Sequence, residues 1–276
     1  MIETHTGNNG GIPLRGHLRA TLRICRLMTH VVLGSVIMAV LIPWSRLQGR
    51  PTPPTAWWYR GAVQLYGVKV KRLPGPVPPV PSLVVCNHLS WLDIIVLASE
   101  VPSVFVSKDG IRNWPLIGWY ARQFGTIFLE RGKHQTQMVG EAMAQGLNKG
   151  VAVVIFPEAT TSGYNRPRRF YARLFSGAIN AGVPVVPAAL AYPDVKRQRM
   201  NSAALFVDNE PFLNSVWRVL AQPSTDAELR FGRALPVQGR TRDELAEESH
   251  SAVCELLEDI LPADDPAPAT RSLRTQ

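Results

Sequence analysis

A histidine and an aspartate stand five positions apart in the stretch NHLSWLD, residues 87–93. The apolar run Ser82–Cys86 precedes this stretch and Ile94–Ala98 follows it, which predicts a buried strand, a tight turn and a helix. His88 would lie at the end of the strand, and Asp93 in the first turn of the helix. A carboxylate fixes the tautomer of a histidine and stabilises its protonated form, so the pair predicts a general base. The alternative is a surface histidine near a helix-capping aspartate.

Polar side chains also follow two other apolar runs. The stretch FGTIFLERG predicts a short strand that ends at Arg131, and VIFPEATTS predicts a buried strand followed by Glu158 and Thr160. Ligands bind at the carboxyl edge of open α/β sheets, so these groups and His88 are expected at one site. Taken separately, Arg131 could be a solvated charge at a strand end, Glu158 a carboxylate at a helix N-terminus, and Thr160 a helix cap. Together they favour a catalytic site.

The elements that would position these groups form an α/β fold, a single mixed, mostly parallel sheet flanked by helices. Strands are expected at residues 82–86, 103–107, 124–131, 151–156, 183–190, 205–207 and 228–231. Helices are expected after the histidine stretch, around Trp217, and at residues 133–148, 176–181 and 241–261. The last of these opens with the capping-box signature TRDE.

The positive charge is concentrated at the N-terminus. Residues 1–72 hold ten Lys and Arg against a single acid, a net charge of +9, whereas residues 73–276 hold twenty of each. An apolar segment lies within the basic region, which favours an anionic membrane surface over nucleic acid as the partner. With 276 residues, the chain can form one sizeable domain with appendages, or two small domains.

The apolar segment of the N-terminal region is short for a membrane span. Residues 31–44 carry no charge, and a helix of that length covers roughly 21 Å against a hydrocarbon core of roughly 30 Å. We expect a half-inserted helix or a marginal span; the alternative is an amphipathic helix that packs on the domain's own core. The expected divisions are a disordered N-terminus (1–13), a membrane-associating helical segment (14–70), a proline-rich linker (71–81), a catalytic domain (82–261) and a disordered tail (262–276).

The three cysteines indicate neither a disulfide framework nor a metal site. Cys25, Cys86 and Cys254 are odd in number, widely spaced and without metal-ligand spacing. Cys86 lies on a predicted strand, so it is interpreted as a buried thiol. We expect a reducing compartment and no metal.

The chain resembles the lysophospholipid (glycerolipid) acyltransferase family. NHLSWLD is similar to that family's N-H-x4-D motif, FGTIFLERG to its second block, VIFPEATTS to its F-P-E-G-T-x-S block and GVPVVPAAL to its V-P-[IV]-x-P block. The four blocks occur in the family's order and cover roughly residues 82–192. The histidine block alone is a weak signal, and the four together are a strong one.

The resemblance implies direct acyl transfer without a cofactor. His88, oriented by Asp93, would take the proton of an acceptor hydroxyl, whose oxygen attacks the thioester of acyl-CoA or acyl carrier protein. No Ser or Cys stands in a G-x-S-x-G elbow, so no acyl-enzyme is expected. Arg131 would hold the acceptor's phosphate, Glu158 would line the acceptor site, and Thr160 would belong to the neighbouring turn.

Two positions depart from the family pattern. Ala159 stands where the family has Gly, and Thr161 stands where lysophosphatidate enzymes commonly have a phosphate-binding Arg. Losing that cation weakens phosphate binding unless a nearby arginine, such as Arg166, replaces it. Thr161, followed by S-G-x-N-R, also resembles the subgroup that acylates lyso-ornithine lipid, or other lysolipids with a different head group. Lysophosphatidate is slightly preferred here, because it is the commoner acceptor in the family.

The resemblance also implies partners and a location. The expected partners are a lysolipid, the acyl donor and a membrane, with no nucleic acid. The expected location is the inner membrane, with the catalytic domain facing the cytoplasm. Two alternatives remain: a non-catalytic membrane scaffold, in which His88 and Asp93 would lie too far apart to interact, and a thioesterase or lipid hydrolase that uses His88 with water.

Overall fold

The fold is built around one seven-stranded sheet. The computed structural model describes residues 12–48, 56–114, 117–129, 135–148, 150–162, 166–194, 199–207 and 210–260. The strand order is β1-β9-β6-β2-β5-β3-β4, and every neighbouring pair is parallel except the antiparallel pair β6 and β9. The strands are β1 (Val68–Arg72), β2 (Leu83–Cys86), β3 (Ser103–Lys108), β4 (Ile127–Leu129), β5 (Ala152–Ile155), β6 (Val185–Ala191) and β9 (Thr225–Phe231). The expected mixed, mostly parallel sheet is confirmed.

The middle of the sheet consists of its most apolar strands. Strand β2 lies between β5 and β6, and every residue of the three strands is buried. Strands that are covered on both faces require continuous aliphatic runs, and these three sequences supply them. The residues that follow β2 therefore emerge at the centre of the sheet edge, where neighbouring strand ends can contribute side chains.

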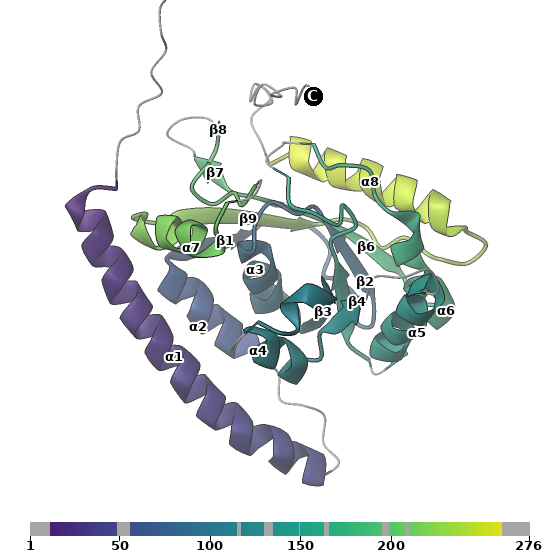
Figure 1. Cartoon of the computed structure of the whole chain (residues 1–276). Helices are drawn as coiled ribbons and strands as arrows, with labels where there is room; N and C mark the ends of the chain where they lie inside the picture. Colours follow the sequence, from purple (N-terminus) through teal and green to yellow (C-terminus); the bar gives the residue numbers. More distant parts are fainter. Residues whose placement is uncertain are drawn as a thin grey trace, which may run out of the picture.

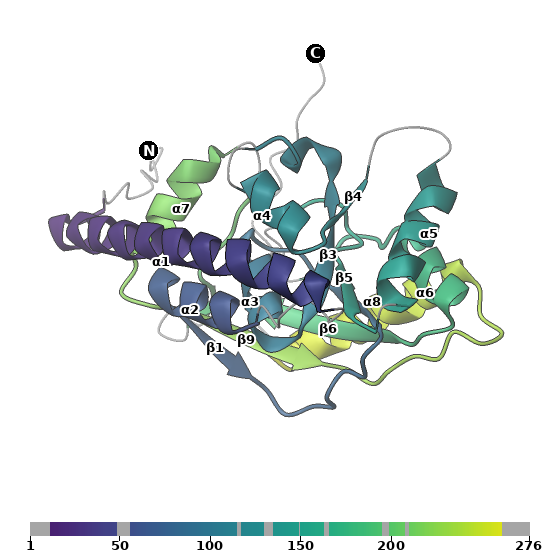
Figure 2. The ribbon, with the colours of Figure 1, turned by 90° about the horizontal axis from the view of Figure 1, so that it is seen from below.

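Helices cover both faces of the sheet. Helix α8 (Arg242–Glu258) lies on one face, while α2 (Ala56–Tyr66) and α3 (Leu92–Glu100) lie on the other (Figures 1 and 2). Helices α5 (Gln135–Asn148) and α6 (Ser176–Ala181) pack together beside β5. The expected capping box opens α8: the Thr241 side chain accepts from the Glu244 N–H, and the Glu244 carboxylate accepts from the Thr241 N–H. Two further helices are α4 (Ile117–Gln123) and α7 (Phe212–Ala221).

The N-terminal helix α1 (Leu14–Leu47) runs along the outside of the domain, against α2 and α7 (Figure 1). Near its start, Arg19 and Arg23 donate hydrogen bonds to backbone carbonyls at the carboxyl end of α7. These carbonyls have no partner within their own helix and carry partial negative charge, so two guanidinium groups suit them. Two arginines of the basic N-terminal region therefore bind the protein itself.

The second half of α1 packs against aromatic side chains. A Cβ at Gly34 would lie 2.1 Å from Nε1 of Trp58, so only glycine permits this approach. The Tyr120 hydroxyl on α4 lies 2.6 Å from Oγ of Ser35 and donates to the Val31 carbonyl at 2.7 Å. Helix α1 is thus attached to the domain at two places along its length.

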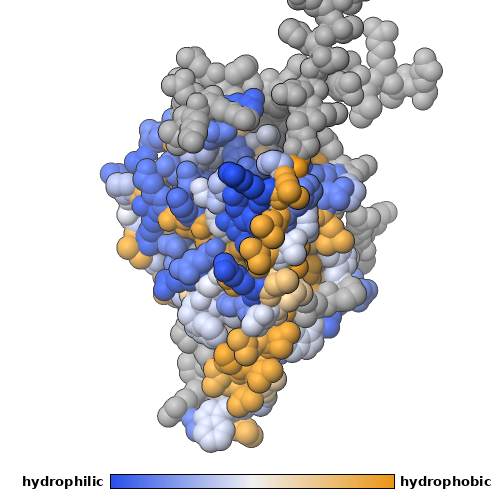
Figure 3. Space-filling view, turned by 90° about the vertical axis from the view of Figure 1, so that its left-hand side faces the viewer, coloured by the Kyte–Doolittle hydropathy of each residue, from blue (hydrophilic) through white to orange (hydrophobic). Residues whose placement is uncertain are grey.

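The outward face of α1 is apolar and exposed. Helix α1 is the one helix in the described part of the chain that is long and apolar enough to cross a bilayer, over Leu14–Leu41. Figure 3 shows its C-terminal half as an apolar stripe on the molecular surface. Exposed large apolar side chains on this half are Val32, Leu33, Val36, Ile37, Val40, Leu41, Trp44 and Leu47. One face of α1 packs on the domain, as the alternative expectation has it, and the other face points outward.

The folded core begins earlier in the chain than Ser82. Strand β1 pairs with β9 within the sheet, and Trp58, Tyr59 and Val63 of α2 belong to the main hydrophobic core. The sheet therefore includes residues assigned above to the linker and to the membrane-associating segment. The five-residue strand escapes recognition because prolines follow it directly. The expected tail at 262–276 and residues 1–11 lie outside the described residues.

One expected strand is absent from the described part of the chain. Residues 205–207 form no strand; the Phe206 N–H instead donates to the Leu89 carbonyl at 2.9 Å. A single hydrogen bond to a turn does not make a β-ladder, and an apolar run of three residues is too short to predict a strand. The segment lies against the turn that carries His88.

Candidate active site

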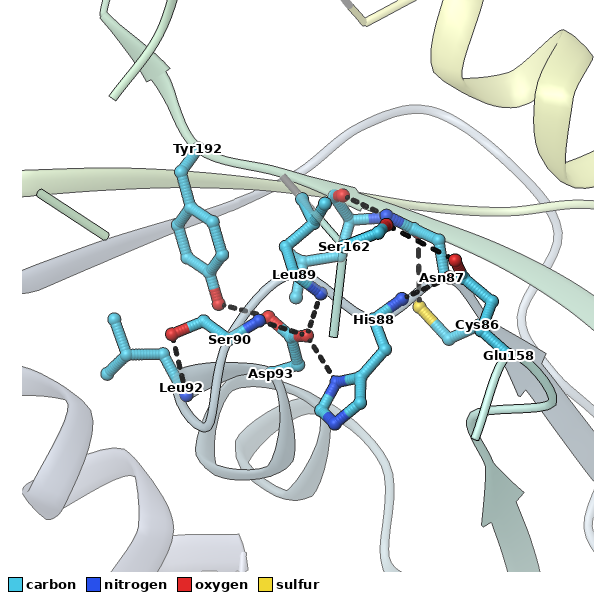
Figure 4. A network of polar contacts seen from close by, with 11 residues as sticks. Cys86, Asn87, His88, Leu89, Ser90, Leu92, Asp93, Glu158, Ser162 and Tyr192 are labelled. Atoms are coloured by element: carbon cyan, nitrogen blue, oxygen red, sulfur yellow. Dashed lines mark hydrogen bonds and ion pairs between the residues drawn. The ribbon is translucent and has the colours of Figure 1, made fainter. Parts of the chain in front are cut away.

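His88 and Asp93 contact each other at the carboxyl end of β2 (Figure 4). Nδ1 of His88 lies 2.8 Å from Oδ2 of Asp93, which also accepts the N–H groups of Leu89 at 2.7 Å and Ser90 at 2.9 Å. Because three donors converge on one oxygen, the carboxylate accepts from Nδ1–H and leaves the lone pair on Nε2. No other described residue bonds Nε2, and the His88 side chain is 18% exposed.

The turn that carries His88 is held by the neighbouring strand. The side chain of Asn87 accepts from the Leu190 N–H and donates to the Leu190 carbonyl, both at 2.9 Å. This amide continues the pairing of β2 with β6 after the strand itself has ended. Asp93 then falls in the first turn of α3, where a helix dipole favours an anion. Local chain geometry thus brings the histidine and the aspartate together.

Glu158 holds the turn of His88 rather than facing open space. Its Oε1 accepts the His88 N–H at 2.8 Å, and its Oε2 accepts the Arg168 N–H at 2.7 Å and the Ser162 hydroxyl at 3.2 Å. Burial raises the pKa of the Glu158 carboxyl, and these hydrogen bonds oppose the shift. The resemblance implies that Glu158 lines the acceptor site; in the structure its carboxylate accepts three hydrogen bonds from the protein.

The third sequence block lies alongside His88. The Ser162 N–H donates to the His88 carbonyl at 2.8 Å, and the Phe156 ring stacks on the imidazole with centroids 4.0 Å apart. Between them, Ala159 adopts a left-handed conformation with φ 58°, at the position where the family has glycine. Thr160 is exposed and Thr161 is partly exposed in this turn, beside the His88–Asp93 pair.

The expected cationic groups are not brought to His88 within the described residues. Arg131 lies outside the part of the chain that the structure describes. Arg166 is exposed, and its guanidinium lies 3.6 Å from Glu258 of α8. Arg168 contributes its backbone N–H to Glu158, and its side chain is exposed.

Two buried groups complete the surroundings of Asp93. The Tyr192 hydroxyl, just beyond β6, donates to Oδ1 of Asp93 at 2.7 Å; no sequence pattern marks this residue except its place after the fourth block. Cys86 is buried as expected, and burial raises the pKa of its thiol well above the usual value, with Asp93 and Glu158 adding to the shift. A thiol held protonated is a poor nucleophile.

The arrangement suits proton removal from a hydroxyl. An imidazole whose Nδ1 contacts a buried carboxylate, and whose Nε2 bonds no described residue, can act as a general base. A family model described as Acyltransferase matches residues 71–191. The fold and the site define an acyltransferase.

Comparison with individual proteins narrows the class. The chain is 35% identical to the lyso-ornithine lipid O-acyltransferase of Pseudomonas aeruginosa over 242 residues, 86% of this chain and 92% of that protein. It is 38% identical to the 1-acyl-sn-glycerol-3-phosphate acyltransferase of Neisseria meningitidis over 134 residues, 48% of this chain and 52% of that protein. The chain belongs to the lysophospholipid (glycerolipid) acyltransferase family.

A solved structure shares the fold. The crystal structure of the 1-acyl-sn-glycerophosphate acyltransferase PlsC from Thermotoga maritima aligns with a TM-score of 0.64 and 18% sequence identity. The alignment covers 90% of this chain and 96% of that chain. At this identity, the likeness supports the architecture alone.

Proposed function

We propose that this acyltransferase moves a fatty acyl group from a thioester donor to the free hydroxyl of a lysolipid, with His88 as the general base. The observation that carries the proposal is the contact of His88 Nδ1 with Asp93 Oδ2 at 2.8 Å, which leaves Nε2 without a bond to any described residue. A positioned general base contributes about 100- to 10,000-fold to a reaction rate.

The proposed transfer has one covalent step. Nε2 of His88 takes the proton of the acceptor hydroxyl while the oxygen attacks the carbonyl carbon of the thioester. The new C–O bond forms, the C–S bond breaks, and the departing sulfur takes the proton back from His88. The donor is acyl-CoA or acyl carrier protein, and the balance of atoms requires no metal or redox cofactor.

We propose lyso-ornithine lipid as the first acceptor to test. The Pseudomonas relative of that name matches along 92% of its length, and the relative from Rhizobium meliloti matches along 76%. Thr161 supplies no charge where a terminal phosphate dianion would favour a second cation. A single cation, for which Arg131 is proposed, suits a less highly charged head group.

Lysophosphatidate is the second candidate acceptor. The Neisseria relatives bear that activity in their names, although they match over a smaller share of this chain. Arg168 and Arg169 are proposed to supply the replacement cation, because the Arg168 N–H bonds Glu158 and both side chains are exposed.

An acceptor screen tests the proposal. Purified protein in lipid vesicles is given lyso-ornithine lipid, lysophosphatidate or lysophosphatidylcholine, each with acyl-CoA or acyl carrier protein, and the acylated product is measured. We expect transfer to one of the first two acceptors, and its loss by at least about 100-fold in His88→Ala. Free fatty acid as the main product would instead favour a thioesterase.

The scaffold alternative fails its own structural requirement. It demands that His88 and Asp93 lie too far apart to interact, whereas their side chains are in hydrogen-bond contact. Transfer that persists unchanged in His88→Ala would still contradict the role proposed for His88.

We further propose that α1 binds the cytoplasmic face of the inner membrane. Its exposed apolar stripe could enter the lipid, and Arg15 and Arg26, which bond no described residue, could meet anionic head groups. This location presents the catalytic domain to a lysolipid in the membrane and to a donor from the cytoplasm.

A further inference from the structure

Tyr192 completes the set of groups that bind Asp93. Its hydroxyl donates to Oδ1 of Asp93 at 2.7 Å, whereas His88, Leu89 and Ser90 all bond Oδ2 (Figure 4). The tyrosine and the aspartate are both fully buried. Both carboxylate oxygens are therefore used, and Tyr192 alone among the described residues bonds the one that does not face His88.

The position of Tyr192 is fixed by the same strand that holds the His88 turn. The Asn87 side chain pairs with the backbone of Leu190, and Tyr192 follows two residues later. Because Asn87 immediately precedes His88, the backbone of β6 sets the distance between the histidine turn and the tyrosine. The contact with Asp93 is thus part of the sheet framework rather than a chance surface contact.

The chemistry of the contact is that of a neutral donor on an anion. Burial, and then the nearby Asp93 charge, raise the pKa of the Tyr192 phenol well above its usual value, so the hydroxyl remains protonated. A hydrogen bond to a carboxylate fixes its rotation and draws charge from it. The oxygen that faces His88 is then both oriented and made a weaker partner for the imidazolium.

We propose that Tyr192 is a positioning residue for acyl transfer, acting through Asp93 to orient His88 and to limit how strongly the carboxylate holds protonated His88. The proposal rests on the general-base role proposed for His88. It concerns a residue outside the four sequence blocks.

Tyr192→Phe tests the proposal with the full-length protein in vesicles. We expect kcat to fall roughly tenfold with KM for the lysolipid unchanged, because the base is misplaced while acceptor binding is retained. We also expect the acid limb of the profile of kcat/KM against pH to move to higher pH by about half a unit. Without the hydrogen bond from Tyr192, the Asp93 carboxylate holds the imidazolium of His88 more strongly. The other titratable groups facing the pair, Cys86 and Glu158, are unchanged in this variant.

Tyr120→Phe is the matched control. Tyr120 is also buried, and its substitution by Phe also removes hydrogen bonds of a hydroxyl group. Their partners, Ser35 and Val31, lie on α1 and not at Asp93. We expect a comparable fall in the unfolding temperature and an acid limb at the wild-type pH. The proposal is overturned if Tyr192→Phe has the wild-type acid limb and kcat, or if its only change is the stability loss seen in the control.

A second measurement reads the coupling without turnover. Diethyl pyrocarbonate modifies neutral imidazole, so the rate of His88 modification across pH, located by mass spectrometry, reports its protonation in folded protein. We expect the midpoint to move upward in Tyr192→Phe, and an unchanged midpoint contradicts the proposal. If the wild type transfers no acyl group, the proposed function fails, while this measurement still decides the role of Tyr192.

Discussion

At the scale of single residues, the site depends on two carboxylates, Asp93 and Glu158, that are buried in the protein interior. Asp93 is fully buried, yet it accepts four hydrogen bonds from the protein. A buried charge requires such compensation, since an unsatisfied one costs several kcal/mol. Glu158 is stabilised in the same way by three donors. The two carboxylates thus fix the imidazole and the backbone of His88 from different sides.

Asp93→Asn isolates the charge from the geometry. The Asn oxygen can accept from His88, Leu89 and Ser90, while its amide can donate to the Tyr192 hydroxyl, which rotates to accept. We expect a folded protein whose kcat falls by about 100- to 10,000-fold, because the imidazolium is no longer stabilised. Circular dichroism checks the fold and steady-state kinetics check the rate. Near-normal kcat would show that Asp93 orients His88 without any need for its charge.

Ala159→Gly should stabilise the protein. At φ 58° the Cβ of Ala159 crowds the backbone, at a cost of about 1 kcal/mol that glycine avoids. The greater conformational entropy of glycine in the unfolded chain offsets part of this gain. We expect the unfolding temperature to rise by about 1–3 °C. Thermal unfolding of the two proteins in the same buffer measures the difference. A lower unfolding temperature would show that the alanine methyl makes contacts worth more than the strain.

At the scale of elements, the attachment of α1 sets how the domain meets its surroundings. Arg19 and Arg23 neutralise the carboxyl end of α7, and Gly34 allows α1 to approach Trp58. Helix α7 in turn holds the site, because its Ser215 hydroxyl accepts from the indole of Trp91, next to the His88 turn. The N-terminal helix is therefore linked to the His88 turn through one intermediate helix, α7.

Arg23→Ala should loosen α1. The guanidinium donates to the carbonyls of Leu220, Gln222 and Pro223, and its loss is expected to cost about 1–2 kcal/mol. Limited proteolysis should cut within α1 faster, and the unfolding temperature should fall. Arg26→Ala is the control on the same helix, because Arg26 is exposed and bonds no described residue. Equal effects of the two substitutions would exclude the contact with α7 as the cause.

At the scale of the whole molecule, one side differs from the rest of the surface. The exposed apolar face of α1 lies on a molecule whose excess positive charge is confined to residues 1–72. An exposed apolar stripe beside basic residues is typical of a helix that lies in a membrane interface. The exposed stripe is costly in water, and burying it in lipid would remove that cost.

Val36→Glu together with Val40→Glu should weaken membrane binding. Both side chains are more than half exposed on α1, so the folded domain should tolerate the change. We expect binding to vesicles with anionic lipid to fall about tenfold, as measured by flotation. Val77→Glu, on the proline-rich loop and 75% exposed, serves as control. Equal binding of the double variant and the wild type would remove α1 from the membrane contact.

Much of the architecture was predictable from the sequence because its causes are local. The aliphatic runs of β2, β5 and β6 predict buried parallel strands, and the Thr241–Glu244 capping box marks the start of α8. The spacing of His88 and Asp93 suffices as well, since a turn and one helical turn bring them together. Strand β1 was missed because five residues before a run of prolines give little periodicity.

The sequence by itself determined the central strands of the sheet and the His88–Asp93 pair, because hydrophobic periodicity and short-range geometry are encoded in neighbouring residues. The resemblance of four motif blocks indicated the family. Only the tertiary structure decided which side chains complete the site. Tyr192 reaches Asp93 across 99 positions of chain, and Glu158 reaches the His88 N–H across 70. Arg23 binds α7 nearly two hundred positions away, although it belongs to the basic N-terminal region whose charge favours a membrane surface. Such contacts follow from the packing of strands and helices, and no local pattern records them.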